Sequence, residues 1–148
     1  MRKIFVFFLI FFALSAHAGS LEECFRAAGR AFHISPVLLK CIADVESHMS
    51  QSAVHRNPNG TVDVGVMQIN SSWIKTIGWR HWARLKIDAC YNIYVGAWIL
   101  SRCIRRYGYT WRAVGCYNAG LSGGRNDRYT RKVYLTYLEK YYRGERGN

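Results

Sequence analysis

Apolar residues recur every three to four positions along most of this chain, and that spacing predicts a mainly α-helical fold. Five such stripes predict helices, over residues 21–32, 36–48, 88–106, 110–117 and 127–142. Ser35 and Asp88 stand where N-caps are expected, and Gly108 stands where a glycine commonly ends a helix. Asp127 is expected to cap the last helix, whose inward residues are expected to be Val133, Tyr137, Leu138 and Tyr141.

One segment departs from the helical spacing. Pro58-Asn59-Gly60 is a turn signal, and Val62-Asp63-Val64 alternates between apolar and polar residues, as a short strand does. We therefore expect a small β-hairpin after the second helix and a short helix near residues 73–77, whereas residues 78–86 show no clear pattern. The second helix ends near a carboxylic acid, Glu46, and the hairpin carries another. The expected fold class is mainly α (α+β), a helical domain with a small β-hairpin beside a cleft.

The N-terminus has the composition of a cleaved export signal. Two basic residues precede an almost wholly apolar run over residues 4–14, and Ala16-His17-Ala18 has the small-x-small pattern of a cleavage site. We expect residues 1–18 to be a signal peptide and residues 19–148 to form one domain that is exported to the periplasm. An uncleaved membrane anchor is the alternative, but the apolar run is too short to cross a bilayer comfortably.

The chain is strongly basic, with a formal net charge of +12 and a pI of about 9.8. Removal of Arg2 and Lys3 with the signal subtracts two charges from +12 and leaves +10. Such a charge predicts an acidic partner, and the export signal favours an anionic envelope surface over nucleic acid. Two interpretations stay open for the basic residues of the second half, a solvated helix face or a binding patch: Arg102, Arg105, Arg106, Arg125, Arg128, Arg131 and Lys132.

All five cysteines follow the expected signal peptide, which predicts an oxidising compartment. They show neither a CxxC motif nor the Cys/His spacing of a zinc site, and no metal or organic cofactor is expected. No cysteine stands beside a histidine in a nucleophile motif, which argues against a cysteine-dependent enzyme. An odd number permits at most two disulfides within the chain. Cys90 and Cys103 would lie about 20 Å apart on one helix, too far to pair with each other.

Four short motifs occur in a characteristic order: Glu46-Ser47, Gly65-Val66-Met67-Gln68-Ile69-Asn70, Asn92-Ile93 and Tyr117-Asn118-Ala119-Gly120. In these motifs the chain resembles lytic transglycosylases of the soluble lytic transglycosylase (SLT) family, whose fold is lysozyme-like. The likeness extends over residues 24–133, nearly the whole expected mature chain. In size the chain is most similar to the small transglycosylases that accompany type III secretion and related envelope-spanning machines.

The resemblance implies a peptidoglycan-cleaving enzyme with Glu46 as its single acid and base. Glu46 would first protonate the bond between MurNAc and GlcNAc and then deprotonate the muramyl 6-hydroxyl, so that a 1,6-anhydro end forms without water. Ser47 and Gln68 would orient the acid and the sugar, and Gly65 would permit close approach in the cleft. Core packing suits Met67 better than a sugar contact. The resemblance nevertheless assigns Met67 to the substrate site, and it also assigns Asn70, Tyr117, Asn118 and Tyr129 to that site.

The same resemblance implies disulfides and partners. Small secretion-linked relatives often carry one cysteine in the first helix and another before the Asn-Ile pair, so Cys24–Cys90 is the first disulfide expected. The resemblance does not extend to a second disulfide; Cys41–Cys116 is the pairing expected among the remaining cysteines, and it would leave Cys103 free. The expected partners are peptidoglycan glycan strands and a component of an envelope-spanning secretion apparatus, and the protein is expected to be a monomer.

Asp63 departs from the pattern of these transglycosylases, which act with one carboxylate. Residues 59–70 also resemble the hairpin of animal c-type lysozymes, in which a second acid follows the glutamate by the same seventeen positions. In retaining glycosidases the second carboxylate stabilises the oxocarbenium centre. Asp63 either does this or braces the hairpin through hydrogen bonds to the backbone.

Three alternatives to the transglycosylase therefore stay open. A hydrolytic muramidase would use Glu46 and Asp63 with water as the acceptor. A wall-binding assembly protein without enzymatic activity would keep the lysozyme-like fold as a scaffold, although the intact site motifs argue against it. A cationic membrane-disrupting protein would rest on charge alone.

Overall fold

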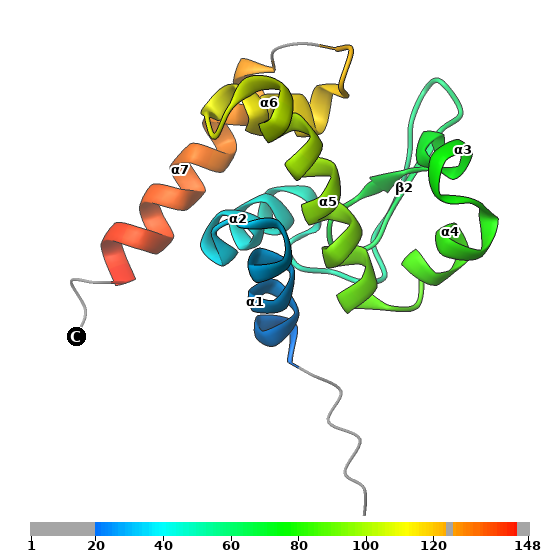
Figure 1. Cartoon of the computed structure of the whole chain (residues 1–148), viewed down its shortest axis with the longest axis horizontal. Helices are drawn as coiled ribbons and strands as arrows, with labels where there is room; N and C mark the ends of the chain where they lie inside the picture. The colour runs from blue at the N-terminus through cyan, green and yellow to red at the C-terminus, as the bar shows by residue number, and fades with distance from the viewer. Residues whose placement is uncertain (1–19, 124–125, 145–148) are drawn as a thin grey trace, which may run out of the picture.

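Helix α5 (Ala89–Tyr107) runs through the middle of the molecule, and the other elements are arranged around it (Figure 1). The computed structural model describes residues 20–123 and 126–144, the last four of these by their backbone only. The expected signal peptide and the expected inward position of the Tyr141 side chain lie outside this description. The described chain is mainly helical with one small antiparallel sheet, which confirms the predicted fold class.

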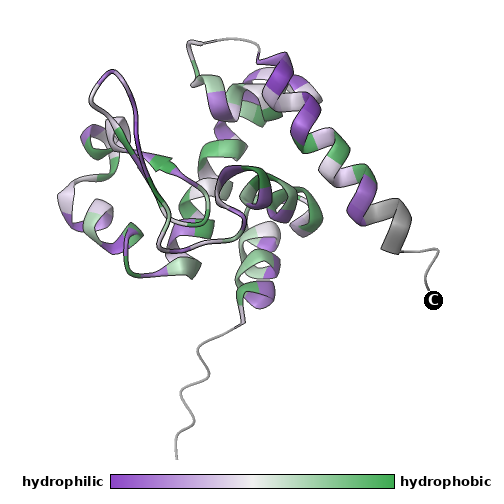
Figure 2. Cartoon of the chain, turned by 180° about the vertical axis from the view of Figure 1, so that it is seen from behind, coloured by the Kyte–Doolittle hydropathy of each residue, from purple (hydrophilic) through white to green (hydrophobic). Residues whose placement is uncertain are grey.

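Two of the four other long helices pack directly on α5, and the other two pack on neighbouring helices. Helices α1 (Leu21–Phe32) and α6 (Trp111–Ala119) pack directly against it, while α7 (Asp127–Gly144) packs on α2 (Pro36–Ser47) and on α6. In Figure 1, α7 forms the outer edge of the molecule on the side away from α3 and α4. Seen from behind, α7 carries hydrophobic stretches between hydrophilic ones (Figure 2). All five predicted helices are present, with bounds close to those expected.

Local side-chain caps determine where the helices begin. The Oγ of Ser35 and the Oδ1 of Asp88 each accept a hydrogen bond from the backbone N–H three residues later, at 3.4 and 2.9 Å, as expected of N-caps. The prediction that Asp127 caps the last helix is wrong. The Oδ1 of Asn126 accepts the Tyr129 N–H at 3.1 Å, and Asp127 is already the first residue of α7. Both residue types are good caps, so the local sequence alone does not distinguish these neighbours.

The sheet has three antiparallel strands in the order β1 (Val54–Arg56), β2 (Val62–Val64) and β3 (Ile69–Asn70). Strands β1 and β2 form the predicted hairpin, and β3 is an addition that the sequence pattern did not indicate. Asp63 sits in the middle strand, opposite His55 of β1 and Asn70 of β3. The sheet therefore holds this carboxylate between two neighbouring strands.

Three short helical segments follow the sheet: η1 (Ser71–Trp73), α3 (Ile74–Ile77) and α4 (Trp79–Leu85). The short helix expected near residues 73–77 is present as α3. Helix α4 lies in the stretch for which the sequence showed no pattern. Only Trp82 and Leu85 of α4 are buried, and two inward positions are too few to produce a recognisable apolar stripe.

Both disulfides end on α5. Cys24 of α1 is joined to Cys90, as the family resemblance implies, and Cys103 is joined to Cys116 of α6. The expected pairing of Cys41 with Cys116 is therefore wrong, and Cys103 is not free. Cys41 lies buried in α2 as a free thiol. Cys116 pairs with Cys103 rather than with Cys41 because helix α6 folds back against α5. This brings the Cα atom of Cys116 within 5.9 Å of that of Cys103.

Candidate active site

Glu46 stands in the last turn of α2 and reaches a small cleft formed with the sheet, α5 and α6. The cavity in this cleft measures about 70 Å³. Three apolar side chains, Ile69, Trp73 and Ile99, form part of its wall. The structure also brings together here six residues that the sequence assigned to the site: Glu46, Asp63, Gln68, Asn70, Tyr117 and Asn118.

The surroundings of Glu46 favour its protonated form. Burial raises the pKa of its carboxyl from 4.5 to about 7; the nearby Tyr129 hydroxyl opposes the rise, and the negative charge of Asp63 adds to it. A carboxyl with a pKa near 7 can both release and accept a proton at neutral pH. This is the property that a single general acid and base requires.

Two tyrosines lie beside this carboxyl. The Tyr117 hydroxyl, from α6, donates to the Met67 carbonyl at 2.7 Å. The Tyr129 side chain, from the first turn of α7, is 7% exposed, and its hydroxyl has no partner at standard hydrogen-bond geometry among the described residues. It is nevertheless near enough to Glu46 to lower the pKa of that carboxyl. Burial, reinforced by the charge of Glu46, raises the pKa of both tyrosines, so each keeps its proton.

Asp63 is held by two asparagine side chains. Its Oδ1 accepts a hydrogen bond from Asn70 Nδ2 at 2.6 Å, and its Oδ2 accepts one from Asn57 Nδ2 at 2.8 Å. The same two amides also donate to Thr61 Oγ1, at 2.9 and 3.1 Å. This network links the carboxylate through side chains to β3 and to the residue that follows β1, rather than through the backbone hydrogen bonds expected of a brace. Asp63 is therefore fixed within the sheet while its charge acts on Glu46 across the cleft.

Four residues assigned to substrate binding do not line the cleft. Tyr129 is one of them and lies beside Glu46, and the contacts of the other three are with the protein itself. Ser47 donates its hydroxyl proton to the Val66 carbonyl at 2.7 Å, which ties the end of α2 to the loop after β2. Met67 is fully buried, in agreement with the packing role that suited it better. Gly65 has a φ of +78° and approaches Asn92 rather than a ligand, because a Cβ there would lie 2.2 Å from the Asn92 Nδ2.

Asn92 explains why the Asn-Ile pair belongs to the motif set. The Asn92 side chain is fully buried in α5. Its Oδ1 accepts the Met67 N–H at 2.7 Å, and its Nδ2 donates to the Val64 carbonyl at 2.9 Å and the Leu85 carbonyl at 3.2 Å. One amide therefore joins α5 to the end of β2, to the loop that follows β2 and to the end of α4. The wall of the cleft depends on this joint.

Gln68 is held in the cleft by an unusual backbone conformation. Its φ of +49° lies in the left-handed region, which costs a residue with a Cβ about 1 kcal/mol. The side-chain amide donates to the Ala53 carbonyl at 3.2 Å and to the Gly65 carbonyl at 3.0 Å. Strain of this kind is maintained only where the surrounding structure imposes it, and it commonly occurs at functional sites.

Sequence reasoning did not assign Trp73 and Ile99 to the site. Trp73 lines the cleft, and its ring packs edge-on against Trp98 with centroids 5.4 Å apart. The Arg102 guanidinium lies 5.1 Å from the Trp98 ring and 5.8 Å from the Trp73 ring. A tryptophan three residues after the Gln-Ile-Asn motif is a signal that could have indicated Trp73. Ile99 reads as an ordinary core position, and only the fold places it in the cleft.

No metal site accompanies these residues in the described part of the chain. Within residues 20–123 and 126–144, no three His, Cys, Asp or Glu side chains come together in a way that could hold a metal ion.

A half-buried glutamic acid at the end of a helix, facing a small antiparallel sheet across a cleft, defines a lysozyme-like enzyme that cleaves glycosidic bonds. The model of the family described as "Transglycosylase SLT domain" matches residues 23–138. The chain belongs to this family of lytic transglycosylases, whose substrate is peptidoglycan.

Several bacterial proteins are similar to the chain over most of its length. Invasion protein IagB of Salmonella typhimurium (strain SL1344) is 38% identical over 136 residues, which cover 88% of this chain and 85% of the relative. Protein IpgF of Shigella flexneri is 37% identical over 142 residues, with coverages of 94% and 88%. The X polypeptide of Escherichia coli (strain K12) is 34% identical over 125 residues, with coverages of 82% and 73%.

Proposed function

We propose that this protein cleaves the β-1,4 bond between MurNAc and GlcNAc in peptidoglycan and leaves 1,6-anhydromuramyl ends. The observation that carries the proposal is the environment of Glu46, in which burial raises the pKa of the carboxyl to about 7. At neutral pH a large fraction of molecules then hold the proton that the leaving oxygen needs. Family membership supports the same activity.

Glu46 acts twice in the proposed reaction. As an acid it gives its proton to the glycosidic oxygen, and the bond from that oxygen to the anomeric carbon of MurNAc breaks. The Glu46 carboxylate then takes the proton of the muramyl 6-hydroxyl, and the 6-oxygen forms a bond to the anomeric carbon. Glu46 recovers its proton and no water is consumed. Both steps use the same group, which is why its pKa must lie near the working pH.

Asp63 and the tyrosines assist this cycle in different ways. Positive charge develops at the anomeric carbon as the bond breaks, and the Asp63 carboxylate, held by Asn57 and Asn70, stabilises it electrostatically. Tyr117 and Tyr129 keep their protons beside Glu46 and remain hydrogen-bond donors throughout. Gln68 and Asn118 line the same cleft and supply amide groups for the acetamido and hydroxyl groups of the sugar.

The second candidate is a hydrolytic muramidase, and the presence of Asp63 in the cleft favours it. In that reaction water attacks the anomeric carbon, and the product is a reducing MurNAc end. Digestion of purified peptidoglycan followed by mass spectrometry of the released muropeptides separates the two candidates. Ends lighter by one water support the transglycosylase, whereas reducing ends contradict it and establish the muramidase.

Two variants on one helix make this experiment specific to Glu46. Glu46→Gln keeps the shape of the side chain and removes the transferable proton, and we expect it to lower product release by about a thousandfold. Asp44→Asn is the matched control, because Asp44 lies in the same helix and pairs with Lys140 at 3.3 Å outside the cleft. Equal product release by Glu46→Gln and the parent would instead favour a wall-binding scaffold protein without enzymatic activity.

The proposal includes export and a role in a larger apparatus. Residues 1–18 are proposed to be a cleaved signal peptide, residues 19–148 the mature enzyme, and the periplasm its location. Among the described residues, no helix has the length and apolar character needed to cross a bilayer. The similarity to a protein named as an invasion protein supports local opening of the wall for a secretion apparatus. This protein is proposed to act as a monomer. Cell fractionation and N-terminal sequencing of the exported form test the location and the cleavage after Ala18.

A further inference from the structure

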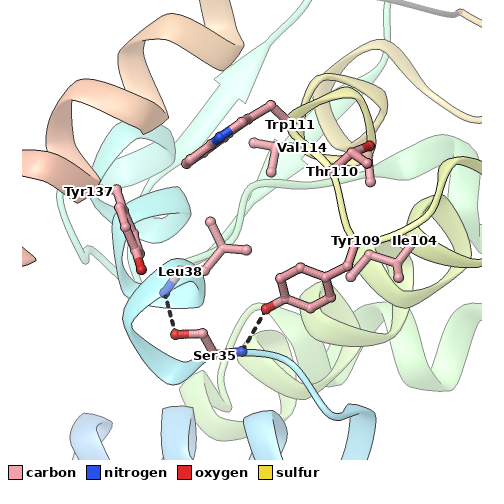
Figure 3. A pocket seen from close by; sticks show the side chains of 9 residues that line it. Ser35, Leu38, Ile104, Tyr109, Thr110, Trp111, Val114 and Tyr137 are labelled. Atoms are coloured by element: carbon pink, nitrogen blue, oxygen red, sulfur yellow. Dashed lines mark hydrogen bonds between the residues drawn. The ribbon is translucent and has the colours of Figure 1, made fainter.

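A second cavity lies on the molecule away from the catalytic cleft, between the N-terminal ends of α2 and α6, the end of α5 and the middle of α7 (Figure 3). Its volume is about 190 Å³. We refer to it as the α6–α7 groove, defined by Leu38, Ile104, Tyr109, Trp111, Val114 and Tyr137. An apolar cavity of about 150 Å³ is enough to bind benzene, so the α6–α7 groove has room for a large apolar side chain.

The wall of the α6–α7 groove is formed before any ligand binds. The Tyr109 hydroxyl accepts the Ser35 N–H at 3.0 Å, which fixes this ring across the start of α2 (Figure 3). The Trp111 ring packs edge-on against Tyr137, with centroids 5.9 Å apart. A binding surface whose side chains are already held in place loses little conformational entropy when it is occupied.

Exposed apolar side chains extend beyond the α6–α7 groove onto the outer face of α7. Tyr109 is 56% exposed, Tyr134 is 41% exposed and Leu135 is 53% exposed. The rings of Trp111 and Tyr134 are in contact, with centroids 5.1 Å apart, and both line a neighbouring hollow together with Arg131. Exposed apolar surface with aromatic side chains is typical of interaction sites.

Basic side chains outnumber acidic ones around this surface. Residues 89–126 contain five arginines and no acidic residue. The guanidinium groups of Arg106 and Arg112 both lie over the Tyr107 ring, 5.6 and 4.5 Å from its centroid. Tyr107 precedes residues 109–111, which line the α6–α7 groove. Asp127 is the one carboxylate that lines the neighbouring hollow, beside Arg131. A partner that places carboxylates along this rim is therefore attracted, and a basic partner is repelled.

We propose that the α6–α7 groove docks an acidic amphipathic segment of a partner protein. Apolar side chains of that segment enter the groove beside Trp111, and its carboxylates face Arg112 and Arg131. A helix that repeats apolar anchors every three to four residues matches an apolar groove with a charged rim. The docking surface is independent of the proposed reaction, because the residues of the catalytic cleft and those of the α6–α7 groove are different.

Two short synthetic peptides of equal length test this proposal. Both carry leucine at helical anchor positions, and the remaining positions are glutamate in one peptide and lysine in the other. Each is titrated into the isotope-labelled protein, and the indole N–H signals of the five tryptophans are followed by NMR. We expect the glutamate peptide to shift the Trp111 signal and to bind at least about tenfold more tightly than the lysine peptide. Its affinity should fall when salt is added.

Variants identify the surface. Trp111→Ser is expected to lower the affinity for the glutamate peptide by at least about tenfold, because aromatic anchors dominate such interfaces. Trp79→Ser is the matched control, since Trp79 is 72% exposed on α4, outside the α6–α7 groove. Arg131→Glu should reverse the preference between the two peptides, which keeps the test valid if Trp111→Ser fails to fold. Peptidoglycan cleavage by Arg131→Glu and Trp79→Ser is expected to match the parent.

Three results would overturn the proposal. The first is the absence of any shift of the Trp111 signal at millimolar glutamate peptide. The second is equal affinity for the glutamate and lysine peptides. The third is a set of shifts confined to Trp73 and Trp98, which would place binding at the cleft. None of these results depends on whether the protein leaves anhydro or reducing ends, so failure here is distinct from failure of the proposed reaction.

Discussion

The side-chain amide of Asn92 occupies the space that any side chain on Gly65 would need. A Cβ on Gly65 would lie 2.2 Å from the Asn92 Nδ2 and 2.6 Å from its Cγ. Because this amide joins α5 to the strand and loop that carry the cleft, the glycine and the asparagine form one structural unit. The glycine in the motif is therefore required by the fold.

Gly65→Ala should lower the free energy of unfolding by about 2–4 kcal/mol, because it combines the cost of a positive φ with the displacement of a buried, hydrogen-bonded amide. Gly60→Ala is the matched control. Gly60 has a φ of +82° but no atom within 4 Å of an added Cβ, so only the backbone cost of about 1 kcal/mol remains. Urea denaturation of both variants checks the difference. Equal losses would contradict the role given to Asn92.

The rate of peptidoglycan cleavage should fall as the pH rises through about 7, because Glu46 must hold its proton to begin the proposed reaction. Asp63→Asn removes a negative charge that raises the pKa of Glu46, so this descending limb should move to lower pH. Tyr129→Phe removes a hydroxyl that lowers the pKa of Glu46, so the limb should move to higher pH. The pH profiles of kcat/KM for the parent and the two variants check these opposite shifts. Shifts in the same direction would show that the Glu46 environment is misassigned.

Glu46→Gln should stabilise the protein at alkaline pH. The Glu46 carboxyl has a pKa of about 7 in the folded protein against 4.5 for the group in water, so the folded state keeps a proton that the unfolded chain releases between these values. Stability is therefore lost as the pH rises through this window, by roughly 3 kcal/mol in full. The gain from Glu46→Gln should be present at pH 8 and absent below about pH 4.5. Thermal unfolding of both proteins at each pH measures the gain, and a gain independent of pH would argue against a raised pKa.

The thiol chemistry of the purified protein should follow the two disulfides of the structure. Mass spectrometry of non-reduced peptides should find Cys24–Cys90 and Cys103–Cys116, with one thiol, at Cys41, that reacts with alkylating reagents only after unfolding. Replacing Cys103 and Cys116 together by serine should cost about 3 kcal/mol, as expected for a short closed loop. A peptide that links Cys41 to Cys116 would contradict the packing of α6 on α5.

Trp73→Ala should lower kcat/KM for peptidoglycan by about tenfold, or about 1.4 kcal/mol, because the variant removes an aromatic wall of the cleft. Trp79→Ala lies on a neighbouring helix without lining the cleft, and it should leave kcat/KM unchanged. Steady-state turnover of labelled peptidoglycan compares the two. An unchanged rate with Trp73→Ala would exclude this side chain from substrate binding.

The parts of the fold that could be predicted are those with local signals. Helices α1 and α2 combine a clear apolar stripe with a serine cap, and both were predicted nearly to the residue. Helix α4 was missed because its two inward residues are defined only by packing. The second disulfide was mispredicted because it depends on how α6 folds back on α5, which no cysteine spacing reveals.

In the active site, too, some features could be predicted from sequence motifs and others depend on three-dimensional packing. The motifs indicated Glu46, Gln68 and Tyr117 correctly as neighbours of one cleft, because the order of motifs implied a known arrangement. They did not reveal that Ser47 and Gly65 contact the protein rather than the cleft. A motif residue that shapes a site and one that touches the ligand look alike in sequence, and only the three-dimensional contacts separate them.

The cleft and the α6–α7 groove lie at opposite ends of the same two helices. Helix α2 carries Leu38 at one end and Glu46 at the other, and α6 carries Trp111 at one end and Tyr117 at the other. A molecule anchored through the groove therefore points its cleft away from the anchor, in a direction that the two helices determine. The chemical repeat of the glycan offers no preferred place for a hole. Attachment to a partner through the groove would provide that choice, so the site of attachment would determine where the wall is opened.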